Sequence, residues 1–147
     1  MGLLGTVLLV AAGIAVIGFF SGSETGLYTI NRFRLRQRAH RRERLAGVLS
    51  WLLSDPVGLL VTLLLGHNLA VYGVTALVTG AYERAGLSSA AGWWRHPDVA
   101  ATLTLVVPLF IFAEVLPKNY FRRHAERLSY LAGPLLVATK FVLLPLV

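Results

Sequence analysis

The chain has 147 residues, which is the length of one ordinary domain. Its composition differs from that of a water-soluble domain: 56% of the residues are hydrophobic, only 14% are charged, and the mean hydropathy is +0.67. Soluble domains carry about 25% charged residues. The absence of cysteine excludes disulfides, thiolate metal sites and cysteine nucleophiles. We therefore expect an integral membrane protein in which any metal is bound by oxygen or histidine.

Three long apolar runs predict three transmembrane helices, at roughly 3–30, 56–82 and 98–121. Each run reaches the approximately 20 residues that a helix needs to cross a bilayer. Helices also satisfy their own backbone hydrogen bonds in lipid. The predicted fold is therefore all-α and membrane-integral, with a single domain over 1–147.

The basic residues indicate the orientation of these helices. Residues 32–44 contain seven arginines and one glutamate, the connector 83–98 has no net charge, and the part after the third run has a net charge of +4. Because basic loops stay in the cytoplasm, the N-terminus is expected outside and the C-terminus inside the plasma or inner membrane. The net charge of +7 is then a topology signal and an anchor for anionic lipid, so nucleic-acid binding is not expected.

The cytoplasmic parts are expected to form juxtamembrane helices at roughly 32–54 and 125–147. The apolar segment Leu128–Val147 leaves two alternatives, a helix on the inner membrane surface or a fourth span, of which the surface helix is favoured.

Small residues recur in the first run at Gly18, Gly22 and Gly26. This spacing permits close contact between helices, either within one subunit or at a dimer seam. Three spans make a thin bundle, which favours an oligomer.

Polar residues interrupt the apolar runs in three places. The clusters are Ser21-Gly22-Ser23-Glu24-Thr25, Gly66-His67-Asn68, and Glu114 followed by Lys118 one turn later. Ionisable residues in membrane spans are costly and often mark functional sites. Structural roles are the alternative for each cluster: serines bonding to their own helix, Asn68 joining helices, His67 as a hydrogen-bonding residue, and Glu114 pairing with Lys118.

Two backbone features lie beside these clusters. Pro117 has no N–H and crowds the carbonyl of Ala113, which predicts a kink or local rewinding next to Glu114. Gly66 would let another backbone come close. Carbonyls freed in this way serve as ion ligands in transporters. Ligation by oxygen alone suits a hard cation such as Mg²⁺, Ca²⁺ or Na⁺, and a site with few carboxylates suits Mg²⁺.

The depths of the clusters are harder to reconcile. Asn68 lies about 18 Å from the start of the second run and Glu114 about 6 Å from Lys118, at 1.5 Å per residue. The two side chains can meet only if the second run begins below the hydrocarbon, or if the helices are tilted or broken.

Taken in order, these motifs resemble those of the CorC/CorB/CNNM magnesium transporters. The matching stretches are Phe19–Thr25 with Asn31-Arg32, then Leu64–Asn68, then Glu114–Lys118. The resemblance implies a homodimer with three spans per subunit, Mg²⁺ bound between the spans, and a cytoplasmic position for Leu128–Val147. It also implies Mg²⁺ efflux, Na⁺ coupling in some members, and a cytoplasmic pair of CBS modules in full-length chains.

The same resemblance implies which residues are ion ligands: Ser21, Ser23, Asn68 and Glu114, with a carbonyl near Gly66. Glu24 is expected to shape the cytoplasmic mouth or to pair with a basic residue. Two positions depart from the family pattern, which has asparagine at His67 and glycine at Ala113.

The leading hypothesis is a transporter that moves Mg²⁺ by alternating access. A Mg²⁺ sensor or regulatory subunit that does not itself transport is the alternative, because its sequence would look the same. An enzyme is not expected, since the chain has no His-Glu-x-x-His motif and no nucleophile with an adjacent base.

Overall fold

The structure, a computed structural model, describes residues 3–86 and 96–143, and every regular element in these two ranges is helical. In chain order the elements are α1 (Leu3–Thr29), α2 (Arg32–His40), α3 (Arg44–Ser54), α4 (Pro56–Arg84), α5 (Pro97–Pro108), the π-helix η3 (Leu109–Val115), α6 (Leu116–Arg123) and α7 (Ala125–Leu143).

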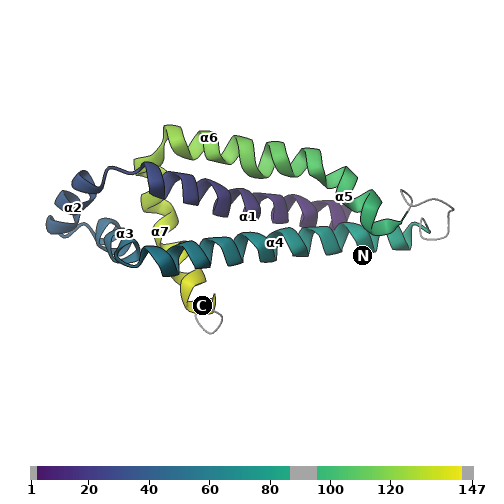
Figure 1. Ribbon diagram of the computed structural model, residues 1–147, viewed down its shortest axis with the longest axis horizontal. Coiled ribbons are helices and arrows are strands. Elements are labelled where there is room, and N and C mark those ends of the chain that lie inside the picture. Colours follow the sequence, from purple (N-terminus) through teal and green to yellow (C-terminus); the bar gives the residue numbers. More distant parts are fainter. Residues whose placement is uncertain (1–2, 87–95, 144–147) are drawn as a thin grey trace.

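Three long helical stretches run side by side and form the body of the molecule (Figure 1). They are α1, α4 and the composite helix α5–η3–α6, and each is long and apolar enough to cross a membrane. The predicted all-helical membrane fold is confirmed. The helices α2, α3 and α7 gather at one end of this bundle, which we call the basic end because it contains the arginines of α2.

Two helices at the basic end begin at side-chain caps. The Asn31 side chain accepts hydrogen bonds from the backbone N–H groups of Phe33 (3.0 Å) and Arg34 (3.2 Å) at the start of α2. Asp55 accepts from the N–H of Gly58 (3.0 Å), and Pro56 follows it as the first residue of α4. Caps of this kind satisfy N–H groups that have no partner inside the helix, and proline suits the first helical position. They fix where the chain turns from α1 into α2 and from α3 into α4.

The third stretch changes partner along its length. Near its start it packs against α4, where the hydroxyls of Tyr82 and Thr104 are 2.7 Å apart. Further along it packs against α1, with Pro117 beside Gly18 and Phe121 beside Gly22. The third stretch therefore separates from α4 on the way to the basic end.

The glycine stripe of α1 is explained by this packing. A Cβ atom at Gly18 would lie 2.8 Å from Pro117, one at Gly22 would overlap the ring of Phe121, and one at Gly26 would lie 2.8 Å from the Ser129 hydroxyl. All three glycines thus face α6 and α7 of their own chain. Of the two alternatives for this stripe, the structure bears out packing within one subunit.

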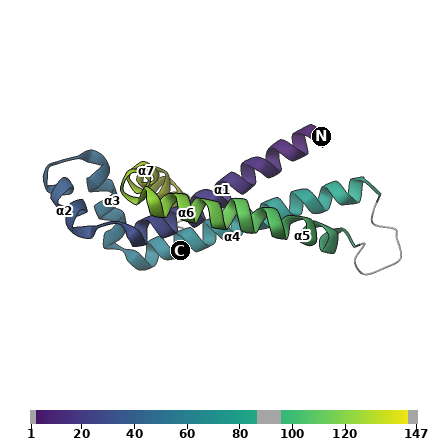
Figure 2. The ribbon, with the colours of Figure 1, turned by 90° about the horizontal axis from the view of Figure 1, so that it is seen from above.

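The last helix, α7, lies across the end of the bundle and not along it (Figures 1 and 2). It contacts α1, α3 and α4. Leu131, Leu135 and Phe141 are exposed on its outer side, whereas Ala132, Leu136 and Leu143 are buried. This arrangement favours the surface helix over a fourth span.

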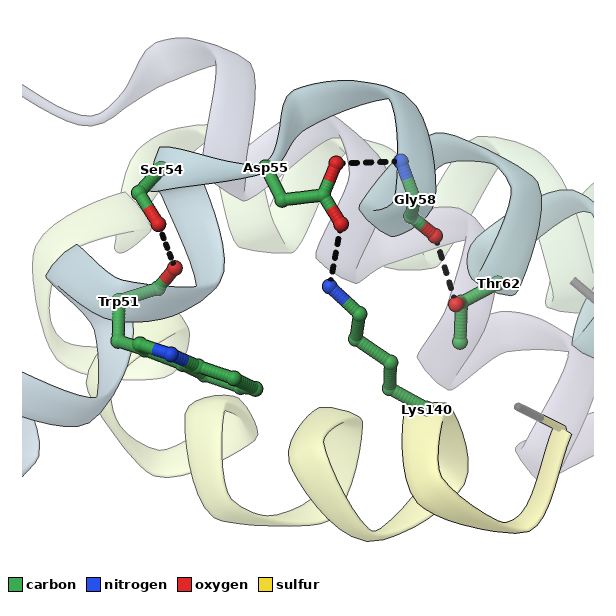
Figure 3. A network of polar contacts seen from close by, with 6 residues as sticks. All are labelled: Trp51, Ser54, Asp55, Gly58, Thr62 and Lys140. Atoms are coloured by element: carbon green, nitrogen blue, oxygen red, sulfur yellow. Dashed lines mark hydrogen bonds and ion pairs between the residues drawn. The ribbon is translucent and has the colours of Figure 1, made fainter.

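An ion pair joins α7 to the start of α4 (Figure 3). The Lys140 ammonium donates to the second carboxylate oxygen of Asp55 at 2.6 Å and lies 5.2 Å from the ring centroid of Trp51. The hydrogen bond from Lys140, followed by that from the Gly58 N–H, lowers the pKa of Asp55 below its ordinary value of 3.8. One carboxylate thus caps α4 and holds α7 against it.

Candidate ion site in the membrane spans

The Ser21 side chain faces the inside of the bundle. Ile17, one helical turn away, packs with Val74 of α4 and Ala113 of η3, so Ser21 lies on the stripe of α1 that faces both other spans. Ser21 is 2% exposed, and its hydroxyl has no hydrogen-bond partner within the described residues. Nearly all buried polar groups in proteins are paired, so an unpaired one requires an explanation.

Ser23 is also buried and unpaired, but it lies on another side of α1. Two residues along an α-helix correspond to a rotation of about 200°, so Ser21 and Ser23 point in nearly opposite directions. The Ser129 hydroxyl of α7 is buried and unpaired as well, and it lies against Gly26, one turn from Ser23. The structure therefore does not bring the two predicted serines to one point.

The third span is rewound where Glu114 is attached. The π-helix Leu109–Val115 lies between Pro108 and Pro117, and the Leu116 N–H donates to the carbonyl of Ile111, five residues earlier. The predicted local rewinding next to Glu114 is confirmed. Single turns of π-helix are rare and frequently lie at functional sites.

One carbonyl of the π-helix is directed at α1. A Cβ atom at Gly18 would lie 3.4 Å from the Phe112 carbonyl oxygen, so glycine at this position leaves that oxygen accessible from the α1 side. The sequence predicted a freed carbonyl beside Glu114, at Ala113, and the structure shows the neighbouring carbonyl of Phe112 at α1. The resemblance had implied a ligand carbonyl near Gly66 instead. The proline on each side of the π-helix was the available signal.

Glu114 is half-exposed, and its nearest cation is Lys118. The Lys118 nitrogen is 3.9 Å from a Glu114 carboxylate oxygen, at the limit of an ion pair, and each side chain is 44% exposed. Exposed pairs of this kind contribute little stability, about 0–1 kcal/mol. The carboxylate is therefore held loosely and remains available to another cation.

Gly66 and Asn68 lie on different sides of α4. A Cβ at Gly66 would lie 2.6 Å from the ring of Phe20, so it is a side chain and not a backbone that approaches this glycine; the expected backbone approach was wrong. Since α4 is a continuous α-helix, the carbonyl of Gly66 belongs to its regular hydrogen-bonding pattern. The exposed Asn68 side chain donates to the Leu64 carbonyl at 2.8 Å.

The depths of Asn68 and Glu114 agree better than the sequence suggested. Gly66 lies opposite Phe20, and Gly18 lies opposite Pro117. Since α1 and α4 are antiparallel, Asn68 lies near the level of Gly18, and Glu114 lies within about one helical turn of it. The two levels match because α4 begins at the basic end, where Asp55 contacts α7.

The described residues hold no cluster of three or more acidic, histidine or cysteine side chains that would suit a metal. The candidate oxygen ligands on the half of the spans toward the basic end are instead a buried hydroxyl (Ser21), an amide (Asn68), a carbonyl (Phe112) and a carboxylate (Glu114). Mg²⁺ keeps several waters and binds through one or two carboxylates, so such a sparse set suits it better than it suits Ca²⁺. Glu24 is half-buried and lines a cavity of about 40 Å³ with Tyr28 and Arg32, near the start of α4.

Three helices of this length and apolarity define a multi-pass membrane protein. Residues 7–147 match the family described as the cyclin M transmembrane N-terminal domain, CNNM. The chain belongs to this family.

Known relatives agree with this assignment. The chain is 37% identical to the UPF0053 inner membrane protein YfjD of Escherichia coli over 136 residues, which is 90% of the chain and 29% of that protein. It is 31% identical to a UPF0053 protein of Haemophilus influenzae, over 91% of the chain and 30% of the relative. A chloroplastic DUF21 domain-containing protein of Arabidopsis thaliana is 28% identical over 83% of the chain and 18% of its own length. The chain thus spans less than a third of these relatives.

Proposed function

We propose that this chain is the membrane domain of a Mg²⁺ transporter, which binds the ion between its spans and releases it by alternating access. Membership of the CNNM family supports this function, because the family is linked to the transport of Mg²⁺ and other divalent cations. The direction we propose is efflux, with Na⁺ as the candidate coupling ion. The proposal assigns no catalytic group.

The observation that carries the proposal is the unpaired hydroxyl of Ser21, which is buried on the side of α1 that Ile17 turns toward α4 and the rewound third span. A buried hydroxyl without a partner costs about 1–3 kcal/mol. An ion, or one of its bound waters, would supply the missing partner. We assign Ser21, Asn68, Glu114 and the Phe112 carbonyl to this ion, and leave Ser23 and the Gly66 carbonyl outside its shell.

Ion binding requires two side chains to exchange partners. Glu114 has to leave the Lys118 ammonium. Asn68 has to turn its amide oxygen toward the ion, whether or not its nitrogen keeps the hydrogen bond to the Leu64 carbonyl. Both present contacts are local to their own helix, so neither exchange disturbs the packing between helices. Lys118 then acts as a tethered cation that neutralises Glu114 when Mg²⁺ has left.

The complete transporter is proposed to be a homodimer with a cytoplasmic CBS pair. The relatives extend well beyond the matched region, which leaves room for such modules. The third span has only 17% of its most apolar window buried in the described chain, so most of its surface is available to lipid or to a second copy.

The test is Mg²⁺ flux by purified protein in liposomes loaded with a Mg²⁺ indicator, with and without a Na⁺ gradient. Glu114→Gln and Asn68→Ala are expected to abolish flux, because each removes an ion ligand. Glu83→Gln is the matched control: it removes an exposed carboxylate at the far end of α4 and should leave flux unchanged.

Two outcomes would contradict the proposal. Normal flux in both ligand variants would overturn the site. Mg²⁺ binding by wild-type protein without any flux would favour the alternative, a sensor or regulatory subunit that does not transport.

A further inference from the structure

A second polar site lies on the surface where α1 meets the end of η3 and α6. It is a groove of about 340 Å³, lined by Thr25, Val115, Lys118, Asn119 and Arg122. Lys118 and Arg122 are one helical turn apart and therefore project from the same face of α6. Four of the five lining residues carry polar side chains, and two of these are cations.

The charges in the groove are poorly neutralised. Arg122 forms no ion pair among the described residues, and its guanidinium donates to the Asn119 side-chain oxygen at 3.3 Å. Within the part of the chain that the structure describes, the ion pair of Lys118 is the loose contact with Glu114, at 3.9 Å. The Thr25 hydroxyl donates to the Ser21 carbonyl over a long 3.3 Å. The groove therefore presents hydrogen-bond donors and positive charge, and the Glu114 carboxylate that contacts Lys118 is only loosely held.

A groove with donors and positive charge suits an anion, and its position in the molecule indicates which kind of anion. The third span ends at Arg123, so Lys118 and Arg122 lie within its last turns, where lipid head groups meet the protein. Along the same span, the exposed side chains Val107, Ile111 and Val115 lead away from the groove toward the bilayer interior. The charged groove matches the head group of a phospholipid, and the adjoining strip of apolar side chains matches its acyl chain.

We propose that this groove binds the phosphate of an anionic phospholipid from the inner leaflet. Arg122 and Lys118 neutralise the phosphate, since guanidinium and ammonium groups form strong charge-assisted hydrogen bonds with it. The Asn119 amide donates a further hydrogen bond. One acyl chain lies along Val107, Ile111 and Val115. Lys118 is shared with the proposed ion site, where it pairs with Glu114, so the test rests on Arg122, which has no part in that site.

Native mass spectrometry of the chain purified in detergent tests this proposal by counting bound phosphatidylglycerol per chain during titration. Arg122→Gln is expected to weaken binding about tenfold, more than the roughly fivefold expected from loss of one charge near a membrane surface. The matched control is Arg123→Gln, which removes the same charge from the next, exposed position of the same helix outside the groove. It should weaken binding by no more than the roughly fivefold of a general charge effect, and by less than Arg122→Gln does, if the site is local.

A charge-conserving variant and a lipid without net charge serve as further controls. Arg122→Lys retains the positive charge and should bind within about threefold of wild type, which separates loss of charge from loss of fold. Phosphatidylcholine, whose head group has no net charge, should bind at least about tenfold more weakly than phosphatidylglycerol. Three results would each overturn the proposal. The first is an equal effect of Arg122→Gln and Arg123→Gln, and the second is equal binding of the two lipids. The third is release of phosphatidylglycerol by about 10 mM inorganic phosphate, a concentration at which salt screening is still modest.

Discussion

Ser21 and Ser23 are both buried, but they face different parts of the molecule. Ser21 lies on the stripe with Ile17, toward α4 and η3, and Ser23 lies nearly opposite, one turn from the Gly26–Ser129 contact. Only the first of these positions is on the side of α1 that faces the rewound helix carrying Glu114. The two hydroxyls are therefore expected to contribute differently to ion binding.

Serine-to-alanine substitutions separate the two roles. Ser21→Ala should lower Mg²⁺ flux in proteoliposomes at least about tenfold, because it removes a proposed ligand worth about 1.4 kcal/mol or more. Ser23→Ala should leave flux unchanged and raise thermal stability in detergent, since it removes a buried hydroxyl that has no partner. A larger loss of flux from Ser23→Ala than from Ser21→Ala would reverse the assignment.

Close packing at Gly22 gives a prediction about stability. Gly22→Ala places a methyl group into the ring of Phe121 and should destabilise the protein by about 1–3 kcal/mol through overpacking. Gly73→Ala is the control: it lies inside α4 with open space around it, and should be neutral or stabilising by up to about 1 kcal/mol. Thermal unfolding of both variants in the same detergent measures the difference. Equal stability of the two would show that α6 is not packed tightly on α1.

At the scale of the elements, α7 is held to α4 by the pair between Asp55 and Lys140. The pair is only partly shielded, with 52% of the Asp55 side chain exposed and 11% of the Lys140 side chain. Trp51 packs against Lys140 and stacks on Phe141, with ring centroids 6.3 Å apart, so α3 takes part in the same contact. The start of a membrane span is thereby joined to a helix that lies across the bundle.

This contact predicts a pH dependence. Because the pKa of Asp55 is lowered in the folded protein, its stabilising contribution is present above the ordinary value of 3.8 and is lost as the pH falls through the lower folded value. Asp55→Asn should therefore be less stable than wild type at pH 6, and the difference should be smaller at pH 3, because it shrinks as the pH falls below 3.8. Thermal unfolding at both pH values tests this. The same difference at both values would exclude the carboxylate as its cause.

The partner substitution checks the origin of the effect. Lys140→Met should weaken α7 docking at pH 6, and combining it with Asp55→Asn should cost less than the sum of the two single changes, since both remove one interaction. Strict additivity would mean that the two side chains do not interact in solution.

For the whole molecule, the arginine-rich end is predicted to face the cytoplasm. The chain has no cysteine, so a single introduced one reports its own location. In intact cells an impermeant thiol reagent should label Ala85→Cys, at the exposed end of α4, and should label Gln37→Cys, on the exposed surface of α2, only after permeabilisation. The reverse pattern would invert the topology. Labelling of both in intact cells would indicate a leaky preparation or a dual orientation and contradict a single topology.

Several features of this protein followed from the sequence because they depend on composition and local chemistry. Long apolar runs bounded by charges predict spans, since every backbone group in lipid has to be paired within a helix. Pro117 predicted the rewinding of the third span, because proline removes a backbone donor wherever it lies in a helix. The order of the Ser21, Asn68 and Glu114 motifs indicated the family before any contact was known.

Only the tertiary structure decided which residues face one another. The direction of a side chain depends on the rotation of its helix, so Ser21 and Ser23 look equivalent in the sequence and lie apart in the bundle. The Gly18–Gly26 stripe fits a dimer seam or an internal contact equally well until α6 and α7 are seen to cover it. The approach of the Phe112 carbonyl to Gly18 and the groove at Arg122 arise from contacts between helices distant in the chain; the flanking prolines indicate the rewinding but not the helix that it faces.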